Sequence, residues 1–496
     1  MDFASTSVLC LIGLSTLIFI YVWKHLNKRA CMPPGPFPLP VIGNLLQMNS
    51  GMPQSLKELS KTYGPVYTVY LGLKPVVVLY GYDAVKEALE DHGEEFSGRG
   101  SSPIFDKVLE DFGFSSSGER WKQIRRFSVM TLRNFGMGKR SIEQRIQEEA
   151  EFLVKELRKT NESPFDPTHI FTNAVSNVIC SIVFGKRFEY EDKEFVKLLS
   201  MMTDINPLMN SKSGQLYFMI PKIMDYLPGP HKRALGCIEG LLEFVERRVK
   251  INLETLDPSS PRDFIDSFLI KMEQENTNPA SEFHMKNLVT AVVGLFFAGT
   301  ETVSTTLRHG VLLLLKYPEI EEKIHNEIQQ VVGANRTPAL SDRAKMQYTD
   351  AVIHEIQRFS DILPLGIPHT TTQDAYFRGF TIPKGTDVLP ILSSVLHDST
   401  QFPNPEQFNP ERFLSDSGGF KKNLAFVPFS TGKRSCPGEG LARMELFLFL
   451  TLILQKFHLK SVTNPKEIDI KPKSSSFVNL PVDFEFCVIP RYNVRK

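Results

Sequence analysis

The chain has 496 residues, with 57 basic and 56 acidic side chains and a formal net charge of +1. This balance gives no overall field that would attract nucleic acid or an acidic substrate. The length alone predicts about three domains, but no Gly/Ser linker or internal repeat divides the chain. The cysteines are scattered without metal-type spacing, which indicates a reducing compartment and no disulfide framework; they are Cys10, Cys31, Cys180, Cys237, Cys436 and Cys487. We therefore predict one large core.

The first 29 residues differ in composition from the rest of the chain. Residues 3–23 carry no charge, and about 20 apolar residues span the hydrocarbon core of a bilayer. Asp2 precedes the run, and the basic or titratable residues Lys24, His25, Lys28 and Arg29 follow it. A cleaved signal peptide is the alternative, but it would need a basic start and a small-residue cleavage site. The positive-inside rule predicts a membrane anchor over 1–29, with everything after Lys24 on the cytoplasmic side.

A proline-rich segment over 30–44 separates this anchor from a globular part over 45–496. Five prolines lie between Pro33 and Pro40, and such a density favours a stiff, extended backbone. The segment serves as a spacer, or as a hinge that sets the tilt of the globular part.

Short elements are predicted at the start of the globular part. Apolar runs at 67–71 and 75–79 indicate a β-hairpin, residues 83–89 a short helix, and the Gly- and Ser-rich residues 101–117 a loop. Trp121 and Arg125 stand four residues apart in a helical segment and share one face. Taken alone, this pair indicates a core tryptophan and a solvated arginine.

Two buried helices are predicted further along the chain. The first ends at Gly185, and the second runs over about 282–316 and is apolar all round between residues 291 and 298. Glu301 and Thr302 are polar residues inside this apolar helix, and such contradictions often mark function. The structural alternative is that Thr302 bonds to the carbonyl group of residue 298 and that Glu301 has a structural partner.

The pattern Phe-x-x-Gly-x-Arg-x-Cys-x-Gly occupies residues 429–438. Cys436 stands just before a helical run at 441–448, where loop N–H groups and the helix dipole favour a thiolate. Glycines at 432 and 438 allow the backbone to approach a flat ligand closely. From the residues alone, the thiolate is either a nucleophile or a metal ligand.

This loop resembles the haem-binding loop of the cytochrome P450 superfamily, with every defining position filled. The resemblance implies a mainly α fold with small β-sheets and an N-terminal transmembrane helix. It implies haem b as the cofactor, with the Cys436 thiolate as axial ligand of the iron. The other haem-contact positions that it implies are Trp121, Arg125, His369 and Arg434 for the propionates, and Ala298, Gly299, Phe429, Gly432 and Gly438 elsewhere.

The resemblance extends to three further sets of residues. Ala298-Gly299-x-x-Thr302 is similar to the oxygen-binding kink of the superfamily, which makes Glu301 and Thr302 a catalytic proton relay. Glu355, Arg358 and Arg412 resemble a buried structural triad that locks the loop leading to the cysteine. Residues 133–140, 166–185 and 378–386 narrow the resemblance to family 2, the microsomal drug- and lipid-oxidising branch.

The resemblance implies a haem-thiolate monooxygenase that inserts one atom of O2 into C–H bonds of lipophilic substrates, namely fatty acids, steroids or xenobiotics. NADPH–cytochrome P450 reductase would supply electrons, with cytochrome b5 as an optional second partner, and the enzyme would lie in the endoplasmic reticulum membrane. The acidic reductase would dock on a basic face, formed by Lys122, Arg126, Arg133, Lys139, Arg140, Lys433 and Arg443.

The substrate pocket would be lined by mostly apolar segments without a fixed cation, at 101–115, 201–209, 293–302, 362–367 and 477–478. Two other classes of function stay open. One is a reductase-independent haem-thiolate isomerase or dehydratase, and the other is a non-enzymatic haem-binding protein.

Overall fold

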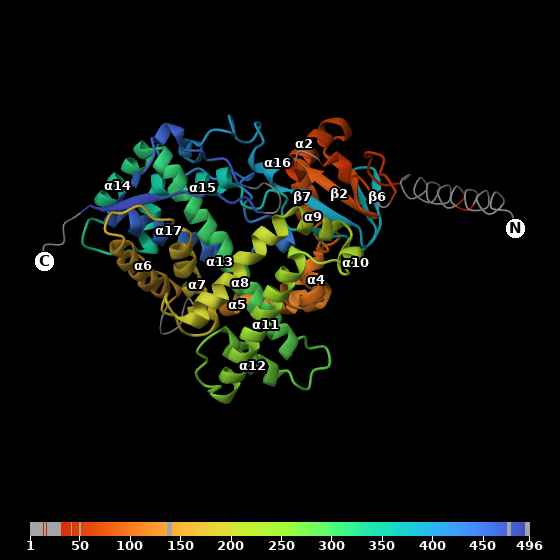
Figure 1. The fold of residues 1–496 in the computed structure, drawn as a ribbon, viewed down its shortest axis with the longest axis horizontal. Helices are drawn as coiled ribbons and strands as arrows, with labels where there is room; N and C mark the ends of the chain where they lie inside the picture. Colours follow the sequence, from red (N-terminus) through yellow and green to blue (C-terminus); the bar gives the residue numbers. More distant parts are fainter. Residues whose placement is uncertain are drawn as a thin grey trace.

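The computed structural model describes residues 13, 16, 31–40, 42–48, 51–135, 141–473 and 478–491. Within these residues the fold is mainly helical, with small sheets, as predicted (Figure 1). The helices are α2 (Met52–Tyr63), α3 (Tyr82–Lys86), α4 (Pro103–Leu109), α5 (Gly118–Phe135), α6 (Ile142–Lys159), α7 (Thr168–Val183), α8 (Lys193–Asn210), α9 (Lys212–Met219), α10 (Pro221–Met224), α11 (Pro230–Glu254), α12 (Phe264–Gln274), α13 (Met285–Lys316), α14 (Pro318–Val331), α15 (Gln347–Ser360), α16 (Leu392–Leu396) and α17 (Glu439–Lys456).

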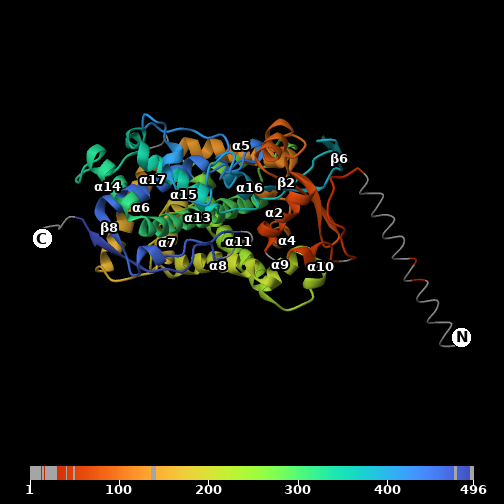
Figure 2. The same ribbon diagram turned by 90° about the horizontal axis from the view of Figure 1, so that it is seen from above.

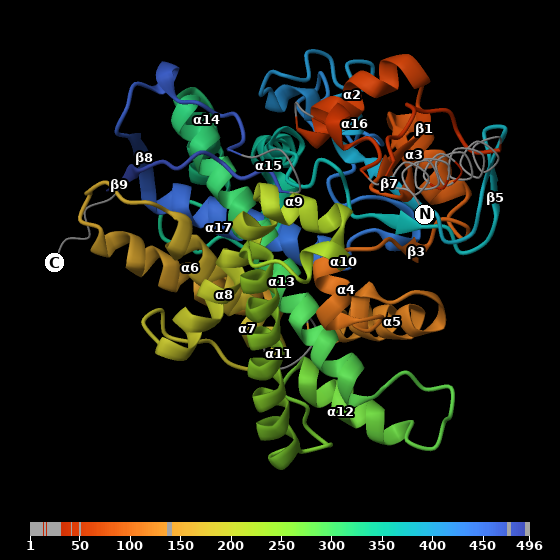
Figure 3. The ribbon, with the colours of Figure 1, turned by 45° about the vertical axis from the view of Figure 1, so that its right-hand side comes forward.

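The strands form three small sheets. The largest has the order β1-β2-β7-β4-β3, and the others pair β5 with β6 and β8 with β9. Their bounds are β1 (Val66–Leu71), β2 (Lys74–Tyr80), β3 (Gly98–Arg99), β4 (His369–Thr370), β5 (Ala375–Phe377), β6 (Phe380–Ile382), β7 (Asp387–Ile391), β8 (Phe457–Ser461) and β9 (Phe486–Pro490). Figure 3 shows the largest sheet with α2 and α16 at one end of the molecule, and α14 with β8 at the other.

Helix α13 is the central element. It packs against α7 and α11 on one side and against α15 and α17 on the other (Figure 2). The sequence predicts a start near residue 282, but the helix begins at Met285 because His284 caps it by accepting a hydrogen bond from the Asn287 N–H. Residues 291–293 and 296 are buried, as the apolar run predicts, whereas Leu295 and Phe297 are half-buried and Ala298 is exposed.

Among the described residues, α13 is also the one helix long and apolar enough to cross a membrane, and its most apolar stretch of 18 residues has a mean hydropathy of 1.4. Of this most apolar stretch, 61% is buried inside the protein. The predicted anchor over 1–29 lies, apart from residues 13 and 16, outside the described residues.

The predicted hairpin at 67–71 and 75–79 is confirmed as β1 and β2, which pair antiparallel. The prediction of a loop over 101–117 is wrong, because α4 forms between residues 103 and 109. Pro103 starts this helix, and Ile104 and Leu109 are buried against the core. Two buried side chains were too few to stand out as a helical pattern, yet their burial stabilises the turn.

The proline-rich segment is attached to the sheet. The Thr68 N–H and hydroxyl donate to the carbonyl oxygens of Pro34 and Pro33, at 2.8 and 2.9 Å. A Cβ atom at Gly35 would lie 1.9 Å from the Thr68 carbonyl oxygen, so the close approach requires glycine. At least this part of the segment is a fixed edge of the fold.

Candidate haem site

The cysteine loop is held by backbone contacts. The Cys436 N–H donates to the Phe429 carbonyl oxygen at 2.9 Å, which closes the loop around the short 3-10 helix η6 (Gly432–Arg434). Gly432 has a φ of +70°, and a Cβ atom there would lie 1.8 Å from the Leu89 carbonyl oxygen. Gly438 directly precedes α17. The close backbone approach and the positive φ therefore require glycine at position 432, whereas a Cβ atom at Gly438 would make only an ordinary contact with Cys436 Sγ, at 3.8 Å.

The Cys436 side chain is accessible, but protein atoms surround it closely enough to affect its pKa. Its side chain is exposed, yet burial in the surrounding protein raises the pKa of the thiol, an effect that Gly438 and Glu439 N–H groups and the Arg125 charge oppose. Ala298 is likewise exposed although most of α13 around it is buried. Exposed side chains within otherwise buried elements are consistent with contact to a ligand.

Beside this loop the structure gathers cationic side chains. Arg434 donates to the carbonyl oxygens of Ser97 and Ser116 at 2.7 and 2.8 Å, and its guanidinium lies 3.8 Å from the centre of the Trp121 ring. Arg125 donates to the Ser435 carbonyl oxygen at 2.6 Å. Trp121, Arg125 and Arg434 thus lie together beside the cysteine loop, and Arg125 is half-buried rather than solvated.

The electrostatics of this cluster are unfavourable without an anion. Burial, and the charges of Arg99 and Arg125, lower the pKa of Arg434 to about 8. Burial, Arg99 and Arg434 lower the pKa of His369 to about 3. Among the described residues, no carboxylate forms an ion pair with Arg99, Arg125 or Arg434. Buried charges need partners, and two propionate groups would supply them, so these residues fit a haem.

Arg99 was missed by the sequence reasoning. It lies on β3 directly opposite His369 on β4, and burial lowers its pKa to about 10. Its sequence context, Ser97-Gly98-Arg99-Gly100, looks like a solvated turn. The residues around Arg99 in the sequence give no sign of this role. Arg99 reaches the cluster only because β3 pairs with β4, which lies some 270 residues later in the chain.

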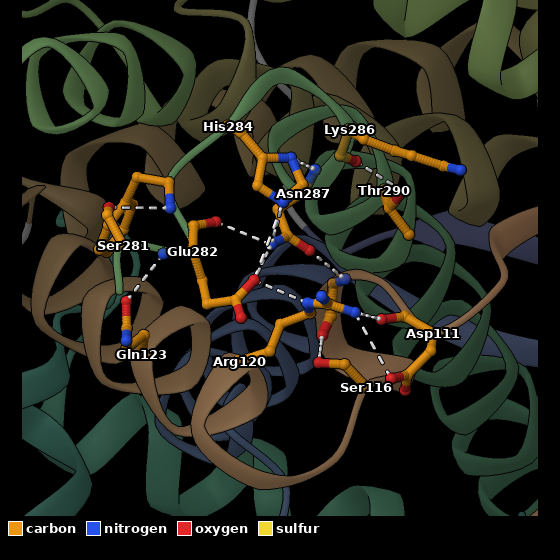
Figure 4. A network of polar contacts seen from close by, with 12 residues as sticks. Asp111, Ser116, Arg120, Gln123, Ser281, Glu282, His284, Lys286, Asn287 and Thr290 are labelled. Atoms are coloured by element: carbon orange, nitrogen blue, oxygen red, sulfur yellow. Dashed lines mark hydrogen bonds and ion pairs between the residues drawn. The ribbon is translucent and has the colours of Figure 1, made fainter. Parts of the chain in front are cut away.

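A polar network holds the segment that Arg434 contacts (Figure 4). The Asn287 side chain accepts from the Gly113 N–H at 3.0 Å and donates to the Glu282 carbonyl oxygen at 2.7 Å. Arg120 bridges Glu282 and the Asp111 carbonyl oxygen, at 2.7 and 2.6 Å. The start of α13 thus fixes the chain around residues 111–116, whose carbonyl groups in turn receive Arg434.

The predicted relay residues lie in an unbroken stretch of α13. The Thr302 hydroxyl donates to the Ala298 carbonyl oxygen at 2.9 Å, the bond expected of the structural alternative. Glu301 is half-buried, and its charge opposes the burial that lowers the pKa of Arg308. Gly299 faces α7, because a Cβ atom there would lie 2.7 Å from Ile179. Close helix packing is therefore sufficient to explain this glycine.

The buried triad is assembled as predicted. Arg358 forms a two-pronged contact with Glu355, at 2.7 and 2.8 Å, and Arg412 reaches the same carboxylate at 3.0 Å. Arg358 also donates to the carbonyl oxygens of Leu396 and Pro405. Glu355 and Arg358 are fully buried. The carboxylate joins α15 to the segment at 403–412 that precedes the cysteine loop.

The predicted basic face is only partly open to a partner. Lys122 pairs with Glu119 at 2.8 Å, Lys433 pairs with Glu94, and Arg443 pairs with Glu439 at 2.9 Å. Arg126 and Arg133 are exposed. Lys139 and Arg140 lie outside the described residues, as do residue 477 of the predicted pocket and residues 136–140 of a family 2 motif.

Comparison with known proteins agrees with this geometry. Residues 33–488 match the sequence profile of the family Cytochrome P450. The chain is 55% identical to Cytochrome P450 2G1 of Rattus norvegicus over 487 residues, which cover 98% of this chain and 99% of the relative. It is 55% identical to Cytochrome P450 2A13 of Homo sapiens over 480 residues, covering 96% and 97%. It is 54% identical to Cytochrome P450 2C5 of Oryctolagus cuniculus over 485 residues, covering 97% and 99%.

The class of enzyme is that of the haem-thiolate monooxygenases. Three findings indicate it, namely the family match across nearly the whole chain, the cysteine loop and the cluster of cationic side chains beside it. The chain belongs to the cytochrome P450 family, and its similar relatives are members of family 2. As in the family, the cofactor is haem with cysteine thiolate ligation.

Proposed function

We propose that this monooxygenase oxidises C–H bonds of lipophilic substrates such as fatty acids, steroids or xenobiotics. We propose that it takes its electrons from NADPH through a flavoprotein reductase. The observation that carries the assignment of the site is the group of guanidinium side chains beside Cys436, which are buried at Arg434 and half-buried at Arg99 and Arg125 and have no carboxylate ion-pair partner among the described residues.

A cavity of about 740 Å³ is lined mostly by apolar residues and would accept a lipophilic molecule, although none of the site residues described above lines it. Ser101 and Leu365 come from segments predicted to line the pocket, and the ends of β1 and β2 with α9 and α10 add Leu71, Phe218 and Ile220. The charged residues of this cavity come from outside the segments predicted to line the pocket. Lys222 lines it, and Lys74 does so in an ion pair with Asp387 at 2.6 Å.

Each residue of the site has a distinct task in this proposal. Haem, when bound, supplies an iron that activates O2 for transfer of one oxygen atom. Cys436 provides the thiolate ligand. Arg434, with Arg99, Arg125, Trp121 and His369, holds the propionates through charge-assisted hydrogen bonds of about 1.5–3 kcal/mol each. The loop of residues 429–438 gives the cofactor a fixed position.

Two residues of α13, Thr302 and Glu301, deliver protons in this proposal. The Thr302 hydroxyl rotates away from the Ala298 carbonyl oxygen and donates its proton toward the active site, and Glu301 supplies a replacement through water. A positioned acid of this kind typically accelerates a reaction by about 10²–10⁴-fold. The Ala298 carbonyl group holds the hydroxyl in place between turnovers.

The exposed Arg126 and Arg133 support docking of an acidic reductase, and cytochrome b5 would use the same face. We place the anchor at 1–29 in the endoplasmic reticulum membrane and the catalytic domain, 45–496, on the cytoplasmic side; the proline-rich segment at 30–44 connects them and is fixed to β1 at Pro33 and Pro34. The uncharged run at 3–23 and the basic residues after it support this orientation.

The test is reconstitution of the full-length protein in lipid vesicles with reductase and NADPH. We expect binding-induced spectral shifts and hydroxylated products from some members of a panel of fatty acids, steroids and drug-like compounds. Conversion of a lipid peroxide without reductase would favour the isomerase or dehydratase class. Absence of turnover in a protein that binds haem would favour a non-enzymatic role.

The ligand assignment is tested separately with Cys436→Ser and Cys436→His. Both variants should lose the thiolate-type absorption band of the reduced carbon monoxide complex. A variant without sulfur at this position that kept the band would overturn the assignment of Cys436.

A further inference from the structure

His354, on α15, connects that helix to the chain that follows the cysteine loop. Its Nε2 atom lies 2.7 Å from an Arg443 Nη1 atom, and its Nδ1 atom lies 2.7 Å from the Asp350 carbonyl oxygen. Arg443 in turn donates to the Glu439 carboxylate at 2.9 Å. Glu439 stands three residues after Cys436. The contacts therefore form a chain from α15 to the first turn of α17.

The hydrogen bonds define the tautomer of His354. A guanidinium group can only donate, so Nε2 must accept the bond from Arg443. Nδ1 then carries the hydrogen and donates it to the Asp350 carbonyl oxygen. Both ring nitrogens are satisfied in this one arrangement, and His354 is 5% exposed. A side chain without an acceptor at the Nε2 position could not hold Arg443 in this way.

Aromatic rings fix the pair on the remaining sides. The His354 ring centre lies 4.4 Å from that of Phe420 and 4.8 Å from that of Phe426. The Arg443 guanidinium lies 5.5 Å from the centre of the Phe426 ring and 5.2 Å from that of Phe429. Phe429 is the residue whose carbonyl oxygen accepts the Cys436 N–H. Arg443 is thus a cation placed directly against the cysteine loop.

We propose that His354 is a positioning residue for the redox centre: it holds the Arg443 guanidinium between Glu439 and Phe429, and so fixes the charge next to the Cys436 thiolate. Groups that do not touch a metal tune it by orienting those that do. The charge of Glu439 disfavours the thiolate at Cys436. Arg443 offsets this charge only while it stays paired, and His354 is the buried group that keeps it there. The inference rests on Cys436 being the iron ligand.

The experiment measures the reduction potential of the haem protein by spectroelectrochemical titration. Reduction adds negative charge, which a fixed cation stabilises. His354→Leu leaves Arg443 free to turn toward solvent and should therefore make the reduction potential more negative. We expect the reduction equilibrium constant to fall at least threefold, which corresponds to about 28 mV because a tenfold change corresponds to 59 mV. The thiolate-type carbon monoxide band should also be lost faster on standing.

Two conservative variants separate positioning from simple loss of structure. Gln places an amide oxygen near the position of Nε2 and can accept from Arg443, whereas Asn reaches only the position of Nδ1. We expect His354→Gln to keep the wild-type potential and His354→Asn to shift it as His354→Leu does. This comparison decides the question if His354→Leu does not fold. Equal potentials in the Gln and Asn variants would overturn the proposal.

The matched control is His325→Leu. His325 also bonds to α17, but at its far end, where it lies 3.2 Å from the Leu454 carbonyl oxygen. Its removal should leave the potential unchanged. In a double-mutant cycle, His354→Leu should add nothing to the shift caused by Arg443→Met, because both remove the same interaction. Additive shifts would mean that His354 does not act through Arg443.

The proposal and the function on which it rests fail differently. A wild-type protein without the thiolate-type band would refute the ligand assignment and this proposal together. A wild-type protein with the band, and a His354→Leu variant of unchanged potential, would refute only the role of His354.

Discussion

Thr302 illustrates how one residue serves both structure and chemistry. Its hydroxyl bonds to the Ala298 carbonyl oxygen, which is what an ordinary buried threonine in a helix does. The bond does not argue against a relay, because a hydroxyl group rotates and donates to one partner at a time. The distinction therefore has to come from a variant that removes the hydroxyl and keeps the helix.

Thr302→Ala should retain haem and substrate binding but divert reduced oxygen to peroxide. We expect the ratio of product to NADPH consumed to fall by about tenfold or more, since positioned proton donors contribute about 10²–10⁴-fold. Thr302→Ser, which keeps the hydroxyl group, is the matched control and should stay close to wild type. An unchanged ratio in Thr302→Ala would remove this residue from the relay.

At the residue scale, the site residues that could be identified from the sequence are those that stand close together in one short motif. Cys436, Arg434 and Gly432 fall within one short motif, and the structure places them around one loop. Arg99 and His354 could not be found in this way. Their importance comes from long-range neighbours, namely His369 across a strand pair and Arg443 on another helix, and no local periodicity encodes such contacts.

At the scale of elements, Glu355 connects α15 to the chain that leads toward the cysteine loop. Glu355→Gln leaves the Arg358 guanidinium fully buried without a charged partner, which typically costs about 3–5 kcal/mol. We expect a large fall in the thermal midpoint and loss of haem on purification.

The control for Glu355→Gln is Glu58→Gln. Glu58 has the same spacing to its partner Lys61, at 2.8 Å, but both side chains are more than half exposed. Surface pairs contribute little, so this change should leave the midpoint almost unmoved. Similar effects of the two substitutions would contradict the structural role assigned to the triad.

Helix α13 also carries a buried histidine, His309, whose contact should make the stability of the protein depend on pH. His309 Nε2 lies 3.0 Å from the Asn479 carbonyl oxygen, and burial lowers the pKa of His309 to about 4, from an ordinary value of 6.5. Between these values the unfolded chain binds a proton that the folded chain does not. The free energy of unfolding should therefore decrease as the pH falls through this range, by up to about 3 kcal/mol.

The measurement is urea unfolding of wild type and His309→Gln near neutrality and at about pH 5. The stability of wild type relative to the variant should be smaller at the lower pH, because only wild type carries the depressed pKa. A difference in stability that does not depend on pH would show that His309 stays in one protonation state.

Helices and strands were predicted correctly where many residues repeat the same hydrophobic pattern. The long apolar helix and the Val-rich hairpin were found because many residues repeat the same signal. Helix α4 was assigned to a loop because its burial depends on a core formed by distant helices. The start of α13 was placed too early because the cap at His284 is a local hydrogen bond and not a hydrophobic period.

For the molecule as a whole, orientation on the membrane can be tested without any haem chemistry. Two Asn-x-Ser/Thr sequences begin at Asn161 and Asn335, and both asparagines are exposed. They would accept glycans if this domain entered the secretory lumen. We expect neither to be glycosylated in a eukaryotic cell, and residues 1–29 to remain on the mature chain.

The measurement is intact mass before and after endoglycosidase treatment, together with N-terminal sequencing. A mass shift removed by the enzyme, or a mature chain beginning beyond residue 20, would overturn the proposed orientation. It would also remove the cytoplasmic reductase as the electron donor.

The parallel pairing of β2 with β7 has a consequence for how this protein is made. Val76 pairs with Asp387, roughly 300 residues later in the chain. A ribosome that adds about 5–20 residues per second needs roughly 15–60 s to deliver the second strand. During that time the apolar residues 76–79 present an incomplete sheet edge, which is a template for aggregation. The nascent chain should depend on chaperones for most of its synthesis.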